Sequence, residues 1–305
     1  MSNSSTIFET LKLLGVASEA TRRIYATETR DVKSLNVYRD EHSGVIYIED
    51  FYVGEETYRK GEYRKEKIAV TGKPDYERRA DAKRRAESYN QFYSEKDIAD
   101  FGCGAGDFLR RIQSEVSSCC GIELQQDYVD SLISGGIKCY TALDELEESS
   151  LGAIFSFHVL EHLANPLTYL SLMKRKLKVG GCVVIEVPHA SDILLSKVSC
   201  DAFKRFTLWS QHLVLHTRYS LLRLMEYAGY YDVTIEGIQR YPLSNHLQWL
   251  SKGLPGGHKS ALSSLDTYEL TSAYASALRK VDATDTLVAI AYNQSLVTTN
   301  RLRDV

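Results

Sequence analysis

The fold of this chain is decided by Ile98-Ala99-Asp100-Phe101-Gly102-Cys103-Gly104-Ala105-Gly106-Asp107-Phe108-Leu109. Apolar residues lead into a run with glycine at every second position, which predicts a buried strand, a glycine turn and the start of a helix. Because glycine has no Cβ, the backbone of the turn can approach a ligand closely, and the free N–H groups of the helix start face the same crevice. The stretch therefore predicts a nucleotide-binding crevice.

An acidic residue follows at the distance that a ribose-binding carboxylate needs. The segment Gly121-Ile122-Glu123-Leu124 places Glu123 19 residues after Gly104, at the end of a second apolar run. In nucleotide-binding α/β folds an acidic side chain near this position binds the ribose hydroxyls. A dinucleotide site would have its third glycine where this chain has Asp107, so the spacing favours another adenosine ligand.

Apolar and helical segments alternate along the rest of the chain, which predicts an α/β fold with a Rossmann-like, doubly wound, seven-stranded sheet. The expected parallel strands are 98–101, 118–123, 136–140, 152–157 and 182–187. A helix at 219–228 and strands at 232–237 and 285–291 complete the sheet, and the last two strands are expected to form an antiparallel pair.

The chain is predicted to have a small N-terminal cap at 1–70 and a body at 71–305. Short helices are expected at 6–14 and 17–26, and alternating residues predict a hairpin of strands 35–38 and 45–48. The charged stretch from 75 to 87 has the composition of a helix. The alternation of basic and acidic residues up to Arg85 indicates a solvated helix face.

About fifty residues separate the last two strands, where hairpins usually have a handful, so 240–284 is predicted to be a lid or binding insertion. A helix is expected at 265–281. The first half is dense in aromatic, amide and imidazole groups, and its glycine turn at 256–257 is expected to meet a diphosphate. The predicted acceptor-binding residues are Arg240, Tyr241, Asn245, His246, His258 and Lys259.

Composition limits the partners. A net charge of −3 over 305 residues offers no basic field for nucleic acid. The six cysteines form no C-x-x-C pair, which indicates reduced thiols and a cytoplasmic protein, and no apolar run approaches membrane-spanning length. We expect neither a nucleic-acid partner nor membrane insertion, and a homo-oligomer stays open.

From about residue 80 onward the chain resembles class I S-adenosylmethionine (SAM) dependent methyltransferases. The resemblance depends on the acid before Gly-x-Gly-x-Gly, on Glu123, on the helix opener His158-Val159-Leu160-Glu161-His162 and on Leu177-Lys178-Val179-Gly180-Gly181 before a strand. It implies SAM as the cofactor. The implied cofactor-binding residues are Asp100, Gly102, Cys103, Gly104, Gly106, Glu123, Leu124, Ala142, Leu143, Phe157 and His158.

A narrower resemblance is to bacterial sugar methyltransferases. Glu186-Val187-Pro188 ends a strand, and an aromatic and a histidine follow, as in sugar C-methyltransferases, where an aromatic, an acid and a histidine serve the acceptor. In this chain those positions are Trp209, Gln211 and His212, and the cap has no cysteine for the zinc ribbon of that family. The departures favour O-methylation of a small polar acceptor, a sugar or sugar-nucleotide of bacterial polysaccharide biosynthesis.

Transfer of a methyl group to a hydroxyl needs a base near neutral pKa and an acceptor held in line. His212 is the predicted general base, because its loop follows the fifth strand at the carboxyl edge of the sheet. Gln211 and Trp209 are expected to orient the acceptor, and His158 to line the methyl path. His162 is expected to face the core.

A metal-assisted reaction stays open, although the favoured prediction has no metal. His158-x-x-Glu161-His162 with the later His212 resembles the magnesium site of small-RNA 2′-O-methyltransferases and some quinone-ring O-methyltransferases. With three imidazoles, such a site would suit manganese, iron or zinc better than magnesium, and the acceptor would then be another small molecule or an RNA 2′-hydroxyl. A non-catalytic SAM-fold binding subunit and a methyltransferase of apolar aromatic acceptors also stay open.

Overall fold

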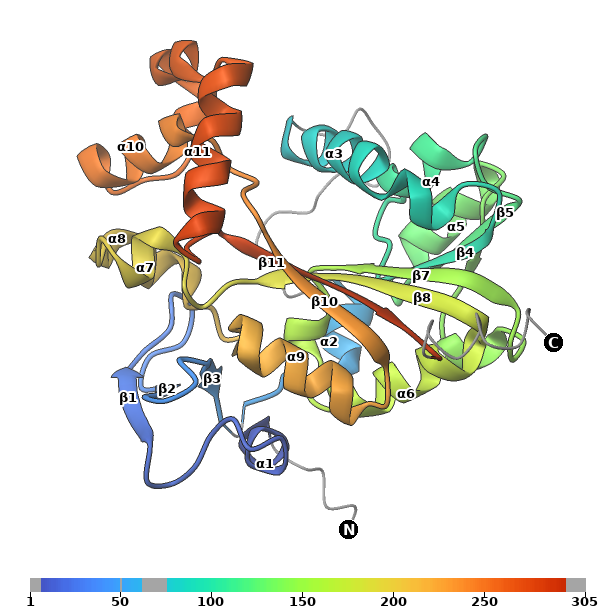
Figure 1. The fold of residues 1–305 in the computed structure, drawn as a ribbon, viewed down its shortest axis with the longest axis horizontal. Coiled ribbons are helices and arrows are strands. Elements are labelled where there is room, and N and C mark those ends of the chain that lie inside the picture. Colours follow the sequence, from blue (N-terminus) through green and yellow to red (C-terminus); the bar gives the residue numbers. More distant parts are fainter. Residues whose placement is uncertain (1–6, 50, 62–75, 295–305) are drawn as a thin grey trace, which may run out of the picture.

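The computed structural model describes residues 7–49, 51–61 and 76–294. Its larger sheet has seven strands in the order β10-β11-β8-β7-β4-β5-β6 (Figure 1). The central and right-hand strands are parallel, and β11 is antiparallel to both β8 and β10. The strands are β4 (Asp97–Phe101), β5 (Ser118–Ile122), β6 (Lys138–Tyr140), β7 (Leu151–Phe157), β8 (Leu177–Pro188), β10 (Tyr231–Ile238) and β11 (Thr286–Tyr292). The predicted Rossmann-like doubly wound sheet is confirmed.

Helices cover both faces of this sheet because both faces of its strands are apolar. Neighbouring residues of β4 illustrate this: Ile98 packs with one core cluster and Ala99 with the other, as the period-2 geometry of a strand requires. On the Ile98 side lie α3 (Tyr76–Tyr93), α4 (Asp107–Ile112) and α5 (Gln126–Ser134). On the other side lie α6 (Pro166–Lys176) and α9 (Arg218–Tyr227) (Figure 1).

The N-terminal region forms a second, four-stranded sheet, with α1 (Ile7–Leu13) packed against it. Its order is β1 (Arg22–Ala26), β2 (Val37–Asp40), β3 (Ile46–Ile48) and β9 (Val214–Leu215). The expected hairpin is confirmed as β2 and β3. The helix expected at 17–26 is wrong, because residues 22–26 pair with β2 as an edge strand, and tertiary pairing overrides weak local propensity.

Strand β9 comes from the segment that follows β8, so the N-terminal sheet is completed by a strand from the body. The short helix α2 (Glu55–Arg59) also reaches the body, where the Tyr169 hydroxyl donates to Glu55 over 2.8 Å. The predicted domain boundary at residue 70 lies outside the described residues, and the division into cap and body stays a prediction.

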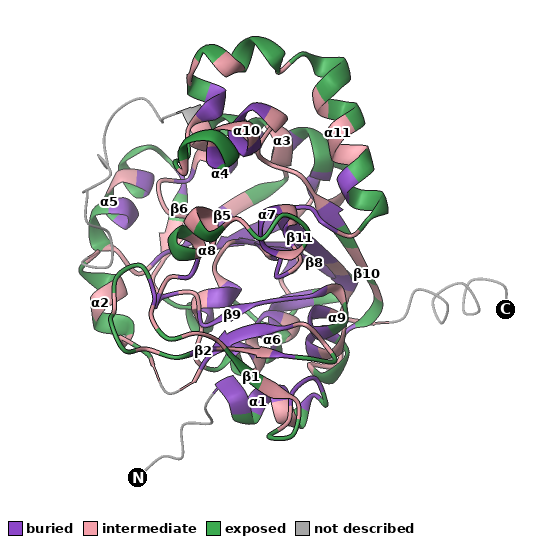
Figure 2. Ribbon diagram, turned by 90° about the vertical axis from the view of Figure 1, so that its left-hand side faces the viewer, coloured by how far each residue is buried: buried purple, intermediate pink, exposed green. Residues whose placement is uncertain are grey.

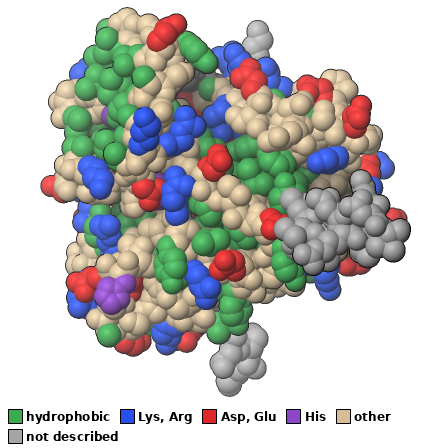
Figure 3. Space-filling view, viewed as in Figure 1, with side chains coloured by type: hydrophobic (Ala, Val, Ile, Leu, Met, Phe, Trp, Pro, Cys, Tyr) green, Lys and Arg blue, Asp and Glu red, His purple; other side chains and the backbone are tan. Residues whose placement is uncertain are grey.

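The insertion before the last strand is helical. It contains α10 (Leu243–Lys252), the 3₁₀ helices η3 (Gly257–Lys259) and η4 (Ala261–Leu265), and α11 (Tyr268–Lys280), which confirms the expected helix at 265–281. Figure 2 shows that much of the outer surface of these helices is exposed. Large apolar side chains are among the exposed ones, and Figure 3 shows hydrophobic surface over this part of the molecule.

Two short helices, α7 (Ile193–Ser196) and α8 (Asp201–Thr207), follow β8 and lie near the base of the insertion (Figure 1). The insertion and these helices therefore gather at the edge of the sheet where β7 and β8 end. Among the described residues, no helix is both long enough and apolar enough to cross a membrane.

Candidate active site

The glycine turn has the geometry that its sequence predicts. Gly102, Gly104 and Gly106 have φ angles of 76°, 55° and 71°, in the left-handed region that favours glycine. A Cβ on Gly102 or Gly106 would lie 2.3 Å from a side-chain carbon of Val159 or Leu132, so packing requires glycine there. A Cβ on Gly104 would meet no described atom within 4 Å, so this glycine faces open space.

Glu123 holds the glycine turn in place. One carboxylate oxygen accepts the N–H of Gly104 over 2.8 Å, and the other accepts the N–H of Gln125 over 2.9 Å. Each carboxylate oxygen has a second lone pair, so Glu123 can still accept the two hydroxyls of a ribose. The arrangement therefore fits the ribose of SAM.

Asp100 adds an acceptor that the protein itself leaves unsatisfied. Its side chain is buried at the end of β4, and its Oδ1 has no hydrogen-bond partner in the described part of the chain. Burial raises the pKa of this carboxyl to about 7. Because a buried acceptor without a donor is costly, a ligand that donates here would bind favourably. The ammonium group of SAM has the required chemistry.

The other residues expected to bind the cofactor range from buried to exposed. Phe157 is buried and stacks on Tyr89, with the Arg85 guanidinium 4.1 Å from its ring centre. Leu143 is also buried and belongs to the core. The half-buried Cys103 and Leu124 flank the glycine turn and the end of β5, and Ala142 is exposed before the 3₁₀ helix η1 (Leu143–Glu145).

A cavity of about 410 Å³ lies between the insertion and the segment that follows β8. All six residues predicted to bind the acceptor line it, and so do His158 and His212. Trp249, from the aromatic-rich first half of the insertion, also lines it. Sequence reasoning missed two further aromatic residues and two carboxyl groups, which are Phe203, Phe206, Asp192 and Asp285.

Several polar groups of the cavity wall already have partners within the protein. Asn245 Oδ1 accepts the N–H groups of Gly256 and Gly257 over 2.8 and 3.3 Å, so these amides do not form the expected diphosphate site. Lys259 lies 2.5 Å from Glu77, and His246 Nδ1 lies 2.7 Å from the hydroxyl of Tyr274. These contacts shape the cavity wall and fix the insertion.

His158 is held between Arg240 and Glu161. It has a left-handed φ of 57°, which strains a non-glycine residue and is typical of functional sites. Arg240 lies 3.0 Å from His158 Nε2 and can only donate, so Nε2 carries the lone pair and Nδ1 the proton. Nδ1 lies 3.3 Å from a carboxylate oxygen of Glu161. Burial, reinforced by Arg240, lowers the pKa of His158 well below its usual value, so the ring is neutral.

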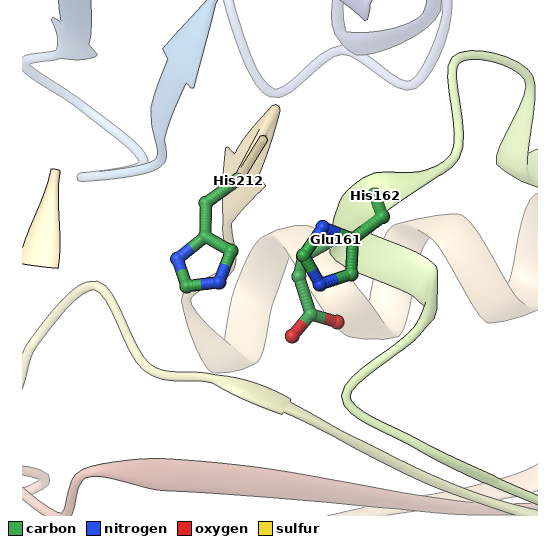
Figure 4. A group of neighbouring side chains, drawn as sticks. All are labelled: Glu161, His162 and His212. Carbon is green, nitrogen blue, oxygen red and sulfur yellow. The ribbon is translucent and has the colours of Figure 1, made fainter. Parts of the chain in front are cut away.

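Glu161, His162 and His212 form a compact cluster beside the cavity (Figure 4). Neither carboxylate oxygen of Glu161 has a hydrogen-bond partner among the residues described, and burial raises the pKa of this carboxyl to about 8. The His162 and His212 rings lie 5.1 Å apart, so His162 faces this cluster. Burial, followed by the influence of His162, lowers the pKa of His212 well below its usual value.

Trp209 and Gln211 lie behind these histidines and do not line the cavity. The Trp209 ring packs at steep angles against both imidazoles, with centres 5.7 and 5.1 Å away. The Gln211 carbonyl lies 2.7 Å from His162 Nδ1, and its side-chain oxygen accepts the hydroxyl of Tyr58 over 2.7 Å. Both residues are therefore placed to orient the histidines.

A buried ionic network at the end of β8 was also missed. Glu186 is fully buried and accepts hydrogen bonds from Arg84, Arg85 and Tyr89 of α3. The solvated face expected for α3 is wrong at Arg84 and Arg85, because both bond to the buried Glu186, which lies about a hundred positions away in sequence. The network locks α3 onto the edge of the sheet where the candidate site lies.

Comparisons with known proteins agree with this geometry. A family model described as a methyltransferase domain matches residues 75–235, which is more than half of the chain. A SAM-dependent methyltransferase from Archaeoglobus fulgidus has a similar structure, with 21% identity, a TM-score of 0.50 and coverage of 70% of this chain and 94% of its own. A SAM-dependent methyltransferase from Thermotoga maritima is 14% identical, with a TM-score of 0.47 and coverage of 72% of this chain and 91% of its own. No curated protein matches the chain.

The likeness to the Archaeoglobus fulgidus structure shows the fold alone, whereas the family match covers the glycine turn, Glu123 and the His158–His162 segment. Asp100 and Glu123 are the groups that would hold the cofactor, and the open space beside Gly104 would accommodate it. The chain belongs to the methyltransferase domain family and is a SAM-dependent methyltransferase.

Proposed function

We propose that this enzyme methylates a hydroxyl of a small acceptor bound in the 410 Å³ cavity, and that the acceptor is a sugar or sugar-nucleotide. The observation that carries the proposal is the position of the cavity. It begins at His158, which follows β7 at the carboxyl edge of the sheet, and extends under the insertion. In open α/β sheets this edge is where ligands bind, so an acceptor in the cavity would lie beside SAM.

The two sides of the cavity support a sugar. Phe203, Phe206 and Trp249 provide an aromatic wall, against which the C–H face of a sugar ring can pack. Tyr241, the buried Asp192 and the half-buried Asp285 provide polar groups for hydroxyls. The volume lies within the range of small-molecule pockets. Asp285 already accepts the N–H groups of Arg240 and Tyr241, and Asp192 accepts that of Leu194, so an acceptor hydroxyl would bind to their remaining lone pairs.

SAM supplies a methyl group that is already activated, so the protein has to position the acceptor, exclude water and take up its proton. His212 lines the cavity and is neutral, which allows it to accept a proton on this side. Its lowered pKa makes it a weak base. We therefore propose that His212 accepts the hydroxyl proton, and that the neighbouring Glu161 stabilises the protonated ring.

The test is a panel of acceptors assayed by release of S-adenosylhomocysteine, with free sugars, sugar-nucleotides and phenols as the three classes. Turnover of sugars or sugar-nucleotides alone would support the proposal. Turnover of phenols alone would overturn the sugar acceptor and leave hydroxyl methylation standing.

The aromatic wall is tested with Phe206→Ala, which should raise KM for the acceptor severalfold and leave SAM affinity unchanged. Tyr227→Ala is the matched control, because Tyr227 is an exposed aromatic of α9 that does not line the cavity. His212→Ala should lower kcat by at least about a hundredfold, the lower end for a positioned base. Native kcat in His212→Ala would remove this residue from the reaction.

A further inference from the structure

We propose that Glu161, His162 and His212 bind one divalent transition-metal ion beside the acceptor cavity, which His212 also lines. One donor atom of each residue lies within 4.8 Å of the other two, so shifts of about an ångström would bring all three to bonding distance of a shared ion. Figure 4 shows both imidazoles on the same side of the Glu161 carboxylate, each with a ring nitrogen directed toward it.

The strongest support for a metal site is the environment of the Glu161 carboxyl group. Glu161 is buried in the 3₁₀ helix η2 (Leu160–His162), and neither of its oxygens accepts a hydrogen bond from the part of the chain that is described. A buried carboxyl group that lacks donors either keeps its proton or requires a nearby cation when it is ionised, and a bound metal ion would supply that cation. His158 Nδ1 lies 3.3 Å from one Glu161 oxygen, but this contact does not have the geometry of a hydrogen bond, so it does not satisfy the carboxyl group.

The two imidazoles are held as metal-binding histidines usually are. His162 Nδ1 lies 2.7 Å from the Gln211 carbonyl, which fixes the proton on Nδ1 and leaves Nε2 as the ligand nitrogen. A backbone hydrogen bond of 2.8 Å from Leu213 to the Glu161 carbonyl joins the segment of His212 to the segment of the carboxylate. Trp209 packs against both rings and restricts their rotation.

His158 is not a ligand in this arrangement, because Arg240 occupies its Nε2 and its Nδ1 carries the proton. The site therefore has two imidazoles and one carboxylate, a donor set that suits zinc, iron, cobalt or manganese better than magnesium or calcium. Three protein ligands leave at least one coordination position open, as in catalytic metal sites. His212 also lines the cavity, so an acceptor oxygen can approach from that side.

The catalytic consequence depends on the proposed function. A divalent ion lowers the pKa of an oxygen ligand, so an acceptor hydroxyl that reached it would lose its proton more easily. His212 would then act as a ligand, and the hydroxyl proton would pass to a water molecule at the open side of the cavity. Binding of the ion does not depend on the identity of the acceptor, so the two can be tested separately.

The direct test uses full-length protein treated with a chelator and then titrated with Co²⁺, whose visible absorption reports nitrogen and oxygen coordination. Native protein should bind about one Co²⁺ per chain, and Zn²⁺ should displace it. Glu161→Gln keeps the shape of the side chain, and it should weaken Co²⁺ binding by at least about tenfold, as should His162→Ala and His212→Ala. His42→Ala is the control, because His42 is exposed in the N-terminal hairpin.

Absence of Co²⁺ binding to the native protein would overturn the site without any variant. Native affinity in Glu161→Gln, with thermal unfolding confirming that the variant is folded, would also overturn it. If Co²⁺ binds at this site but the chelated enzyme keeps full activity, the site stands and its catalytic role is overturned. If Co²⁺ binds and no hydroxyl acceptor turns over, the proposed function fails and the metal site stands.

Discussion

Replacement of Glu123 by alanine tests how the cofactor is held. In the structure its two carboxylate oxygens accept the amides of Gly104 and Gln125, and the remaining lone pairs are available to the two ribose hydroxyls of SAM. Glu123→Ala removes the negative charge and all of these acceptors. We expect SAM to bind much more weakly to a protein that is still folded.

The size of the effect depends on the number of bonds lost. Two hydrogen bonds to an ionised carboxylate are worth roughly 2 to 4 kcal/mol together. At about 1.4 kcal/mol for each factor of ten, this corresponds to a loss in affinity from roughly 30-fold to several hundredfold. Water can enter the space left by the side chain and recover part of the loss. We therefore expect the dissociation constant to rise by more than about tenfold.

Isothermal titration calorimetry with SAM measures this change, and thermal unfolding without SAM reports whether the glycine turn has loosened. Glu147→Ala is the matched control, because Glu147 is an exposed glutamate away from the cavity and the glycine turn. A dissociation constant within twofold of the native value would refute the ribose assignment. Tight binding of a nicotinamide dinucleotide would refute the choice of cofactor.

Four further substitutions test the glycine turn and the buried carboxyl groups. Gly106→Ala should destabilise the fold by about 1 to 3 kcal/mol through its clash with Leu132, measured by urea unfolding. In Gly104→Ala the added methyl meets no described atom, so beyond the strain of a left-handed alanine the change should mainly weaken SAM binding, measured by calorimetry. Burial raises the pKa of Asp192 to about 8, so the folded state keeps a proton that the unfolded chain has released, and stability should fall as pH rises from about 4 to about 8. Asp192→Asn should flatten that slope in thermal unfolding while keeping the cap of α7. Glu186→Gln should cost about 3 to 5 kcal/mol, because it breaks a buried ion pair. Arg85 and Arg84 hold the pKa of Glu186 well below its usual range despite burial, so its stabilisation should be lost as pH falls below about 4.

The parts of the fold that the sequence predicted depend on signals that are local. Alternation of apolar and helical segments needs no knowledge of distant partners, and the strand order agrees with the right-handed connections of parallel sheets. The strand at 22–26 was missed because its structure depends on pairing with β2, and its residues are half-buried or exposed, so they show no core-facing pattern. The burial of Arg84 and Arg85 was missed because Glu186 is a distant residue.

In the candidate site, too, local residue types were predictive and contacts between distant residues were not. Residue types alone placed six polar side chains of the insertion at the cavity, and the structure has all six in its lining. They could not predict that Asn245 accepts the amides of Gly256 and Gly257, or that Lys259 pairs with Glu77. Side-chain chemistry identifies a group that can bind a ligand, but only tertiary contacts show whether that group is already satisfied.

Arg240 illustrates how such contacts complicate the assignment of a role. Its residue type predicts binding to the acceptor, but its guanidinium pairs with Asp81 of α3 and donates to His158, and its backbone N–H donates to Asp285. One residue thus joins the insertion to α3 and also fixes the tautomer that directs His158 Nδ1 toward Glu161. Loss of activity on replacing Arg240 would therefore not identify it as a residue that binds the acceptor. The same change removes the hydrogen bond to His158 and the ion pair that joins the insertion to α3. The acceptor has to be assigned instead from residues that face the cavity and are not part of this chain of contacts, and Phe206 on the aromatic wall is such a residue.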